Sequence, residues 1–204
     1  TVTRAVGAAK PGDVIIVLPG VYNEWVTVTN GGEPGNYVSI LGMGTNTVIG
    51  GFRLMKPWIR IAQFRITGVG AVIPYGIVAD NPAHHAEIWD NWFFSDFAEK
   101  FCIGTGGGTT NALIAHNKLL NPRQYGIVLN GRNSGTHAGA ENHVVSNNFF
   151  TGHGGFDALH VFSANTRIVA NVFSNWSRPD GSTQHTDLIQ TFNYASRPVL
   201  ATNV

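Results

Sequence analysis

The segment Ile168-Val169-Ala170-Asn171-Val172-Phe173 is one of four that decide the fold. Each of the four has an asparagine three residues after an apolar residue, and a large apolar residue soon follows. The others span residues 88–93, 113–119 and 144–149, and weaker versions have Phe64 after Ile61 and Met43 after Ile40. The leading apolar residues recur every 21 to 30 residues, at Ile40, Ile61, Ile88, Ile114, Val144 and Ile168. A period of this length is typical of a solenoid in which each repeat forms one coil.

A second series of strands alternates with the first. Its apolar positions are 26, 24, 32 and 30 residues apart, at Ile77, Ile103, Ile127, Leu159 and Ile189. Two series with matching but variable spacing predict parallel strands stacked about 4.8 Å apart, with the variation placed in loops. We therefore expect an all-β fold, a right-handed single-stranded parallel β-helix.

The repeated asparagines and the two chain ends complete this expectation. Asn91, Asn117, Asn147 and Asn171 are expected to stack as a ladder of amides along the solenoid, and the alternative is four unrelated turn residues. Residues 1–9 predict a short helix that caps one end and blocks edge pairing. Residues 198–204 begin another coil without a cap. We expect one β-helix domain over residues 1–204, truncated at its C-terminal end and open there to self-association or further domains.

Composition excludes several classes of protein. Charged residues make up 12% of the 204 residues and the formal net charge is +1, whereas nucleic-acid binders usually carry a basic stripe. No apolar run approaches the length of about 20 residues that a membrane span needs. The single cysteine, Cys102, allows no internal disulfide. We expect neither a nucleic-acid partner nor a membrane span.

The run from Ala8 to Tyr22, AAKPGDVIIVLPGVY, resembles the opening of pectate-lyase-like right-handed parallel β-helix proteins. That superfamily includes polysaccharide lyases, glycoside hydrolases, epimerases, phage tailspikes and adhesins, so the resemblance implies the fold more strongly than one activity. It also implies a polysaccharide partner and an extracellular or periplasmic location.

A change of residue type in the second strand series marks the candidate site. Aligning Leu159 with Ile189 stacks Asp157 on Asp187 and His160 on Gln190. At the position of the two aspartates, earlier coils have the aromatic residues Tyr75, Phe101 and Tyr125. Two stacked carboxylates repel unless a proton or a cation lies between them. The pair would then hold a cation, for which calcium suits oxygen ligands, or divide the acid and base roles of glycoside hydrolysis. A third alternative is that each aspartate caps a turn.

Other side chains are expected around these carboxylates. Strand alternation points His160, Gln190, Phe162 and Phe192 away from the core, so the two phenylalanines would form a shelf for sugar rings. His185, in the long loop before Asp187, is a candidate acid or base beside His160, and these three residues could alternatively bind a transition metal. Lys100 and Arg123 would flank the groove and bind uronate carboxylates. Two surface histidines and solvated loop charges are the alternatives.

These observations favour an extracellular polysaccharide-active enzyme, and a lyase acting on an acidic polysaccharide more than a hydrolase. Catalysis would rest on Asp157, His160, His185 and Asp187, with calcium held by Asp157 and Asp187. Substrate binding would fall to Lys100, Arg123, Gln190, Phe162 and Phe192. The alternative is a non-catalytic solenoid: a carbohydrate-binding module, an adhesin or a tailspike-like fragment.

Overall fold

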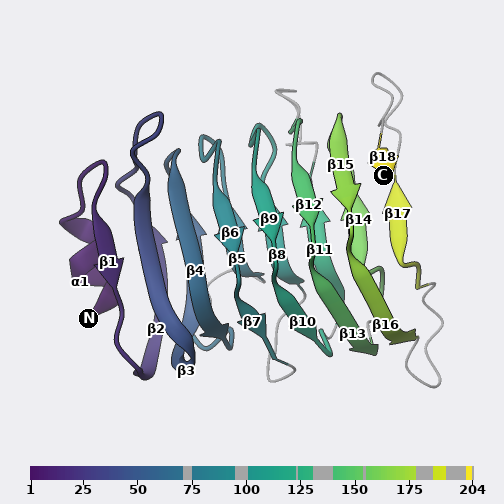
Figure 1. Cartoon of the computed structure of the whole chain (residues 1–204), viewed down its shortest axis with the longest axis horizontal. Helices are drawn as coiled ribbons and strands as arrows, with labels where there is room; N and C mark the ends of the chain where they lie inside the picture. Colours follow the sequence, from purple (N-terminus) through teal and green to yellow (C-terminus); the bar gives the residue numbers. More distant parts are fainter. Residues whose placement is uncertain are drawn as a thin grey trace.

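The chain winds into a parallel β-helix whose coils follow one another along the longest axis of the molecule (Figure 1). The computed structural model describes residues 1–70, 75–94, 101–122, 124–130, 140–153, 155–177, 186–191 and 201–203. One helix and eighteen strands lie in these residues, and the strands pair in parallel from coil to coil. The predicted parallel solenoid is confirmed.

Each full coil has three strands, and equivalent strands stack into three faces. Three long strands, β2 (Gly20–Val28), β3 (Val38–Leu54) and β4 (Ile59–Ile66), bend across more than one face. Face A also contains β1 (Val14–Ile16), β6 (Glu87–Trp89), β9 (Leu113–Ala115), β12 (Val144–Ser146), β15 (Thr166–Val169) and β18 (Ala201–Asn203). Face B contains β7 (Trp92–Phe93), β10 (Lys118–Leu120), β13 (Phe149–His153) and β16 (Val172–Ser177). Face C contains β5 (Tyr75–Ala79), β8 (Phe101–Thr105), β11 (Tyr125–Leu129), β14 (Leu159–Val161) and β17 (Ile189–Thr191).

The helix α1 (Val2–Gly7) lies at the N-terminal end of the solenoid, as predicted. Its buried Val2 and Val6 join the hydrophobic core, so the helix covers the end of the first coil. Glu24 of β2 accepts hydrogen bonds from the backbone N–H groups of Val2 and Thr3, which have no partner within the helix. No helix in the described part of the chain is long and apolar enough to cross a membrane.

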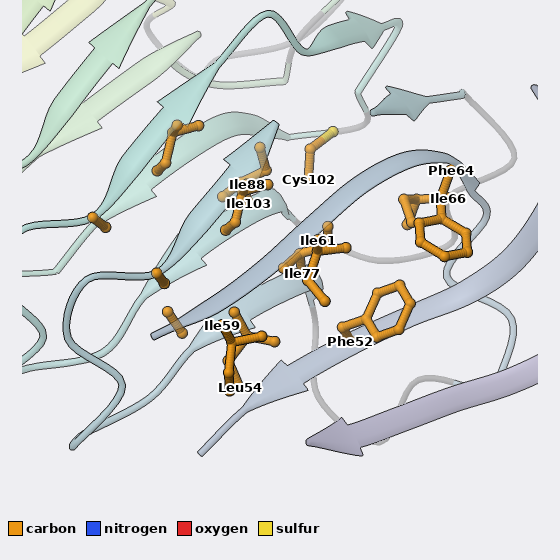
Figure 2. Packing of buried hydrophobic residues seen from close by; sticks show 14 of the residues in the cluster. Phe52, Leu54, Ile59, Ile61, Phe64, Ile66, Ile77, Ile88, Cys102 and Ile103 are labelled. Carbon is orange, nitrogen blue, oxygen red and sulfur yellow. The ribbon is translucent and has the colours of Figure 1, made fainter. Parts of the chain in front are cut away.

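Apolar side chains from all three faces fill the interior (Figure 2). Phe52, Ile61 and Ile77, which lie on different strands, are fully buried there together with Phe64 and Ile103. Each inward residue stacks on its equivalents in neighbouring coils, which gives every coil apolar contacts above and below. This stacking explains why the apolar positions repeat with the coil rather than with a helical period.

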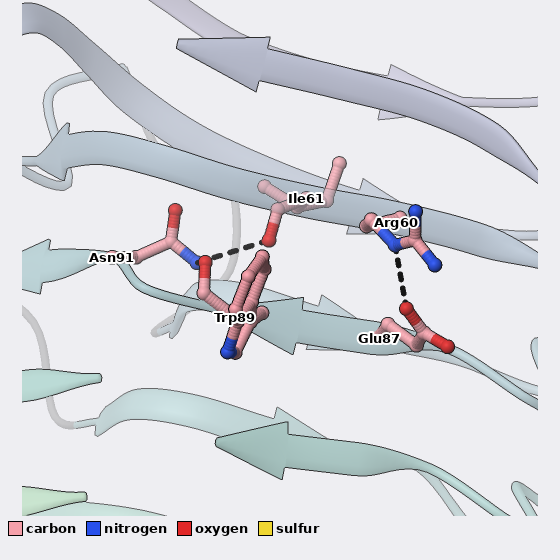
Figure 3. Close-up of polar contacts among 5 residues, drawn as sticks. All are labelled: Arg60, Ile61, Glu87, Trp89 and Asn91. Atoms are coloured by element: carbon pink, nitrogen blue, oxygen red, sulfur yellow. Dashed lines mark hydrogen bonds and ion pairs between the residues drawn. The ribbon is translucent and has the colours of Figure 1, made fainter. Parts of the chain in front are cut away.

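An asparagine ladder runs inside the turn between faces A and B. The Asn91 side chain donates to the carbonyls of Ile61 and Trp89 (Figure 3), and its oxygen accepts from the backbone N–H of Phe64. Asn117 repeats the pattern one coil later: its oxygen accepts from both the backbone and the amide nitrogen of Asn91. The ladder continues through Asn148 to Asn171. These bonds satisfy backbone groups that the turn would otherwise leave buried and unpaired.

The sequence prediction of Asn147 as a ladder residue is wrong, because Asn148 fills that place. Val145, and not Val144, pairs with Ile114 and Ile168, so the register of this coil is shifted by one residue. Asn147 takes the preceding turn position, which is left-handed in every coil of the ladder, as at Ala170 with φ 53°. Asparagine adopts the left-handed conformation readily. Either of the two consecutive asparagines, Asn147 or Asn148, was therefore compatible with the ladder position from sequence alone.

The expected alignment of Met43 with Phe64 is also wrong by one residue. Gly44 pairs with Phe64, while the Met43 side chain is 52% exposed. Strand β3 has register irregularities on both sides of Gly44, which a pattern based on fixed spacing does not predict. The ladder itself therefore begins only with Asn91.

A histidine lies inside the solenoid among the apolar residues. His143 is fully buried, and its Nδ1 accepts a hydrogen bond of 3.1 Å from the backbone N–H of Ala112. Its Nε2 is buried and has no hydrogen-bond partner among the described residues. Burial lowers the pKa of His143 from 6.5 to about 4, because the charged ring would have to leave water. The folded protein therefore holds this ring neutral.

This neutral ring predicts a loss of stability in mild acid. Between about pH 6.5 and pH 4 the unfolded chain binds a proton at His143 that the folded chain does not, so stability falls as the pH falls. The free energy of unfolding is expected to be about 3 kcal/mol lower below pH 4 than above pH 6.5, since one pKa unit corresponds to about 1.4 kcal/mol. Urea unfolding of the protein and of His143→Gln across this range measures it. The variant is expected to lose less stability in acid than the parent, and equal losses would contradict the assignment.

Candidate functional site

The register that defines the candidate site is confirmed. Leu159 of β14 pairs with Ile189 of β17, and His160 pairs with Gln190. The backbone N–H of Ala158 donates to the carbonyl of Asp187 at 2.9 Å, which continues the pairing before the strands begin. Residues 157–160 and 187–190 therefore lie on consecutive coils of face C.

Asp157 and His160 form a buried pair within one coil. Oδ2 of Asp157 lies 2.7 Å from Nδ1 of His160, and the two residues are 1% and 8% exposed. Oδ1 of Asp157 accepts from the backbone N–H of Asp187 at 3.1 Å. Asp157 thus both orients the imidazole ring and caps the turn that enters β17, whereas the Asp187 side chain is exposed.

His160 lies outside the core, as strand alternation predicts, but aromatic rings pack around it and leave it only 8% exposed. Its ring meets the Tyr125 ring edge-on at 5.0 Å between centroids, and the Phe162 ring at 4.5 Å. Strand alternation does keep His160 out of the core that Leu159 and Val161 form. Alternation alone does not show how neighbouring side chains close over an outer position.

A column of aromatic rings approaches the pair along face C. Tyr75, Phe101, Tyr125 and Phe156 stack ring on ring, with centroids 4.7 to 5.1 Å apart. Gly104 allows this arrangement, because a Cβ there would lie 2.1 Å from the Tyr75 ring. All four rings are half-buried, so each leaves part of its surface open to solvent. The rings lie face to face, with 12° to 22° between their planes, so the column presents ring edges to solvent and forms an apolar strip along face C.

Tyr125 brings a hydroxyl group into the same environment. Burial raises the pKa of Tyr125, and the negative charge of Asp157 raises it further. The phenol therefore stays protonated at neutral pH and is able to donate a proton. Sequence reasoning identified Tyr125 only as an aromatic member of the strand series. Its position one coil before Asp157 was the available signal.

The chemical capacity of the group follows from the order of these contacts. The Asp157 carboxylate accepts from Nδ1 of His160, which favours the tautomer in which Nε2 carries the lone pair. An imidazole held in this tautomer presents Nε2 as a proton acceptor. Tyr125 adds an acid on an adjacent coil. A histidine, the carboxylate that orients it and a tyrosine hydroxyl therefore lie together at the C-terminal end of the ring column.

The other predicted site residues divide into two groups. Gln190 is half-buried beside His160 in the next coil, and Phe162 packs against the imidazole ring. Lys100, Arg123, His185 and Phe192 lie outside the described residues, so their roles stay predictions.

Calcium binding also stays a prediction. Both Asp157 oxygens already accept hydrogen bonds, from His160 and from the Asp187 N–H. Among the described residues no three His, Cys, Asp or Glu side chains gather closely enough to hold a metal ion. Calcium takes six to eight oxygen ligands, which these two aspartates alone do not supply. We therefore assign no chemical step to a metal ion.

Comparison with known proteins gives only distant likenesses. No family model and no curated protein matches the chain. A pectin methylesterase in complex with a hexasaccharide is similar over 99% of this chain and 88% of that one, at 10% identity and TM-score 0.48. An alginate lyase from Paenibacillus sp. str. FPU-7 is similar over 92% and 95%, at 16% identity and TM-score 0.42. A PL6 family alginate lyase is similar over 83% of this chain and 33% of that one, at 12% identity and TM-score 0.39. This chain therefore spans about a third of the length of that enzyme.

Proposed function

We propose that this chain is a polysaccharide-active enzyme, and that it is a lyase that cleaves an acidic polysaccharide by β-elimination on face C. The observation that carries the proposal is the buried Asp157–His160 pair, 2.7 Å apart, beside the Tyr125 ring. The aromatic column that leads to this pair supports a polymeric sugar as the substrate, because its stacked rings extend over four coils.

The proposed reaction uses the described side chains in sequence. Nε2 of His160 removes the proton from the carbon next to the uronate carboxyl group. The electron pair of that C–H bond forms a C=C bond, and the bond to the glycosidic oxygen breaks. The Tyr125 hydroxyl donates a proton to the leaving oxygen, and exchange with water then restores both side chains. Lys100 and Arg123 are the predicted partners of the uronate carboxylate.

The position of Asp157 favours elimination over hydrolysis. Glycoside hydrolysis by two carboxyl groups requires that both face the sugar across the scissile bond. Each oxygen of Asp157 already accepts a hydrogen bond, one from His160 and the other from the Asp187 N–H. In that position Asp157 orients the His160 imidazole and does not face a substrate. Histidine, rather than a carboxylate pair, is therefore the proposed base.

A panel of polysaccharides tests the proposal. Alginate, polygalacturonate and neutral dextran are each incubated with the protein, with added calcium or with a chelator. We expect ultraviolet absorbance of an unsaturated product from at least one acidic polymer and none from dextran. New reducing ends without that absorbance would indicate a hydrolase. Neither signal on any polymer, together with retained binding, would indicate a non-catalytic solenoid.

A further inference from the structure

A polar hollow opens on face C, toward the N-terminal end of the aromatic column and away from the Asp157–His160 pair. Its volume is about 300 Å³, and it is lined by Arg53, Met55, Asp80, Asn81, Gly106 and Gly107. These residues lie at or just beyond the ends of β3, β5 and β8, which pair in register on three consecutive coils. A hollow of this volume is at the lower end of the range for small-molecule sites.

An ion pair in the lining of this hollow presents both hydrogen-bond donors and acceptors. Nε of Arg53 donates to Oδ2 of Asp80 at 2.7 Å, and the two side chains are 38% and 25% exposed. The terminal nitrogens of Arg53 and Oδ1 of Asp80 have no hydrogen-bond partner among the described residues. Neighbouring hydroxyl groups of one sugar are therefore able to donate to the carboxylate and to accept from the guanidinium group.

Two glycines leave room for the polar side chains of the hollow. A Cβ at Gly106 would lie 2.8 Å from Oδ1 of Asp80, and a Cβ at Gly108 would lie 3.1 Å from the amide nitrogen of Asn81. A larger residue at Gly106 would therefore displace the carboxylate. The exposed Asn81 adds an amide that both donates and accepts.

The hollow and His160 share one outward row of face C. Starting from Arg53, the residues that pair in register along this row are Val78, Gly104, Val128 and His160. Four steps of about 4.8 Å place Arg53 about 19 Å from His160 along the axis. One extended ligand is therefore able to contact both.

The aromatic column joins these two places. Tyr75 is its first ring, and the amide of Asn130 donates to the Tyr75 hydroxyl at 3.4 Å. Burial raises the pKa of Tyr75, and the negative charge of Asp80 raises it further, so this carboxylate lies within electrostatic range of the phenol. A polysaccharide that follows the column from His160 would therefore arrive at the hollow.

We propose that the hollow is a distal subsite, which binds the hydroxyl groups of one sugar in a polysaccharide whose reacting sugar lies at His160. Arg53 and Asp80 together carry no net charge, so the hollow suits hydroxyl groups better than a uronate carboxylate. Only a ligand that spans four coils occupies both places, so binding favours a polymer over a disaccharide. The place of the reacting sugar rests on the proposed function, whereas the hollow and its ion pair are features of face C itself.

Two variants alter the hollow without changing the Asp157–His160 pair. Asp80→Asn replaces the carboxylate by an amide of the same shape, and Gly106→Ala places a methyl group against that carboxylate. Each is made in the inactive His160→Gln protein, and affinity for alginate and polygalacturonate is measured by calorimetry. Both are expected to weaken binding roughly tenfold, the effect of losing one hydrogen bond to a charged group. In the active protein both are expected to raise KM and leave kcat unchanged, because the subsite is remote from the reacting bond.

Asp90→Asn and Gly7→Ala are the matched controls. Asp90 occupies the left-handed turn position between faces A and B with φ 52°, a conformation that asparagine adopts readily. Gly7 is in α1, where a Cβ would meet no atom within 4 Å. Neither residue lies on face C, so both controls are expected to bind as the parent does. Thermal unfolding followed by circular dichroism checks that all four variants fold.

The outcomes separate this subsite from the proposed function. Equal affinities for the hollow variants and the controls would overturn the subsite, whatever the activity of the unmodified protein. The same loss of affinity for a disaccharide as for the polymer would contradict the link to His160. If the unmodified protein forms no unsaturated product but the hollow variants still weaken polymer binding, the lyase proposal fails and the binding site in the hollow stands. No binding of either polymer by the parent would overturn both.

Discussion

Replacing His160 with glutamine is expected to lower the rate of unsaturated-product formation at least about a hundredfold, because positioned general bases contribute about 10² to 10⁴ in rate. Glutamine cannot remove the proton, although its amide is able to donate to the Asp157 carboxylate and so limit the loss of stability. Asp157→Asn is expected to lower the rate as well, because the carboxylate that orients the imidazole is lost. Initial rates across a pH series measure both effects.

His116→Gln is the matched control for this prediction. His116 is exposed on the turn between faces A and B, with φ 58°, and Gln63 natively occupies the equivalent turn position with φ 63°. The substitution therefore makes the same chemical change at a position that accepts glutamine. It is expected to leave the rate unchanged. Equal rates for the His160→Gln protein and the parent would exclude His160 as the base.

Asn117→Ala is expected to cost about 4 kcal/mol of unfolding free energy, because several buried groups lose their partners at once. The Asn117 oxygen accepts from the backbone and amide nitrogens of Asn91, and its amide donates to the carbonyl of Ile88 and to the Asn148 side chain. Asn117 is fully buried, so water cannot replace these bonds without opening the turn. Urea or thermal unfolding followed by circular dichroism measures the loss.

Asn147→Ala provides the comparison, at the turn between faces A and B in the next coil. Asn147 is exposed and left-handed with φ 54°, and Ala170 has φ 53° at the equivalent position of the next coil. An alanine is therefore compatible with this backbone, and the cost is expected to stay below about 1 kcal/mol, as for most surface substitutions. A loss for Asn147→Ala as large as that for Asn117→Ala would place Asn147 in the ladder, as first expected from sequence.

The solenoid was predictable because its signal is periodic and local. The apolar residue, the turn residue and the asparagine repeat together, and the pairing of Leu159 with Ile189 followed from aligning the same strand in two coils. Faces A and B were harder to separate. A single left-handed residue and a ladder asparagine divide them, so the segment from Ile88 to Phe93 contains parts of two strands, β6 and β7.

The candidate site was predictable in position but not in contacts. Alignment of the coils placed His160 beside Gln190, yet it did not show that Asp157 turns toward His160 within its own coil. The burial of His160 depends on rings from two places, Tyr125 one coil earlier and Phe162 two residues later. Strand alternation gives the side of the sheet on which a residue lies, whereas packing between coils decides what covers it.

The masses of the cleavage products test the central claim most directly. Oligosaccharides released from an acidic polymer by the unmodified protein are analysed by mass spectrometry, beside those released by the His160→Gln protein. Proton removal by His160 predicts products that are lighter by one water molecule than the corresponding hydrolysis products, and their near absence with the variant. Products with the full mass of hydrolysis, or unsaturated products formed equally well by the variant, would contradict it.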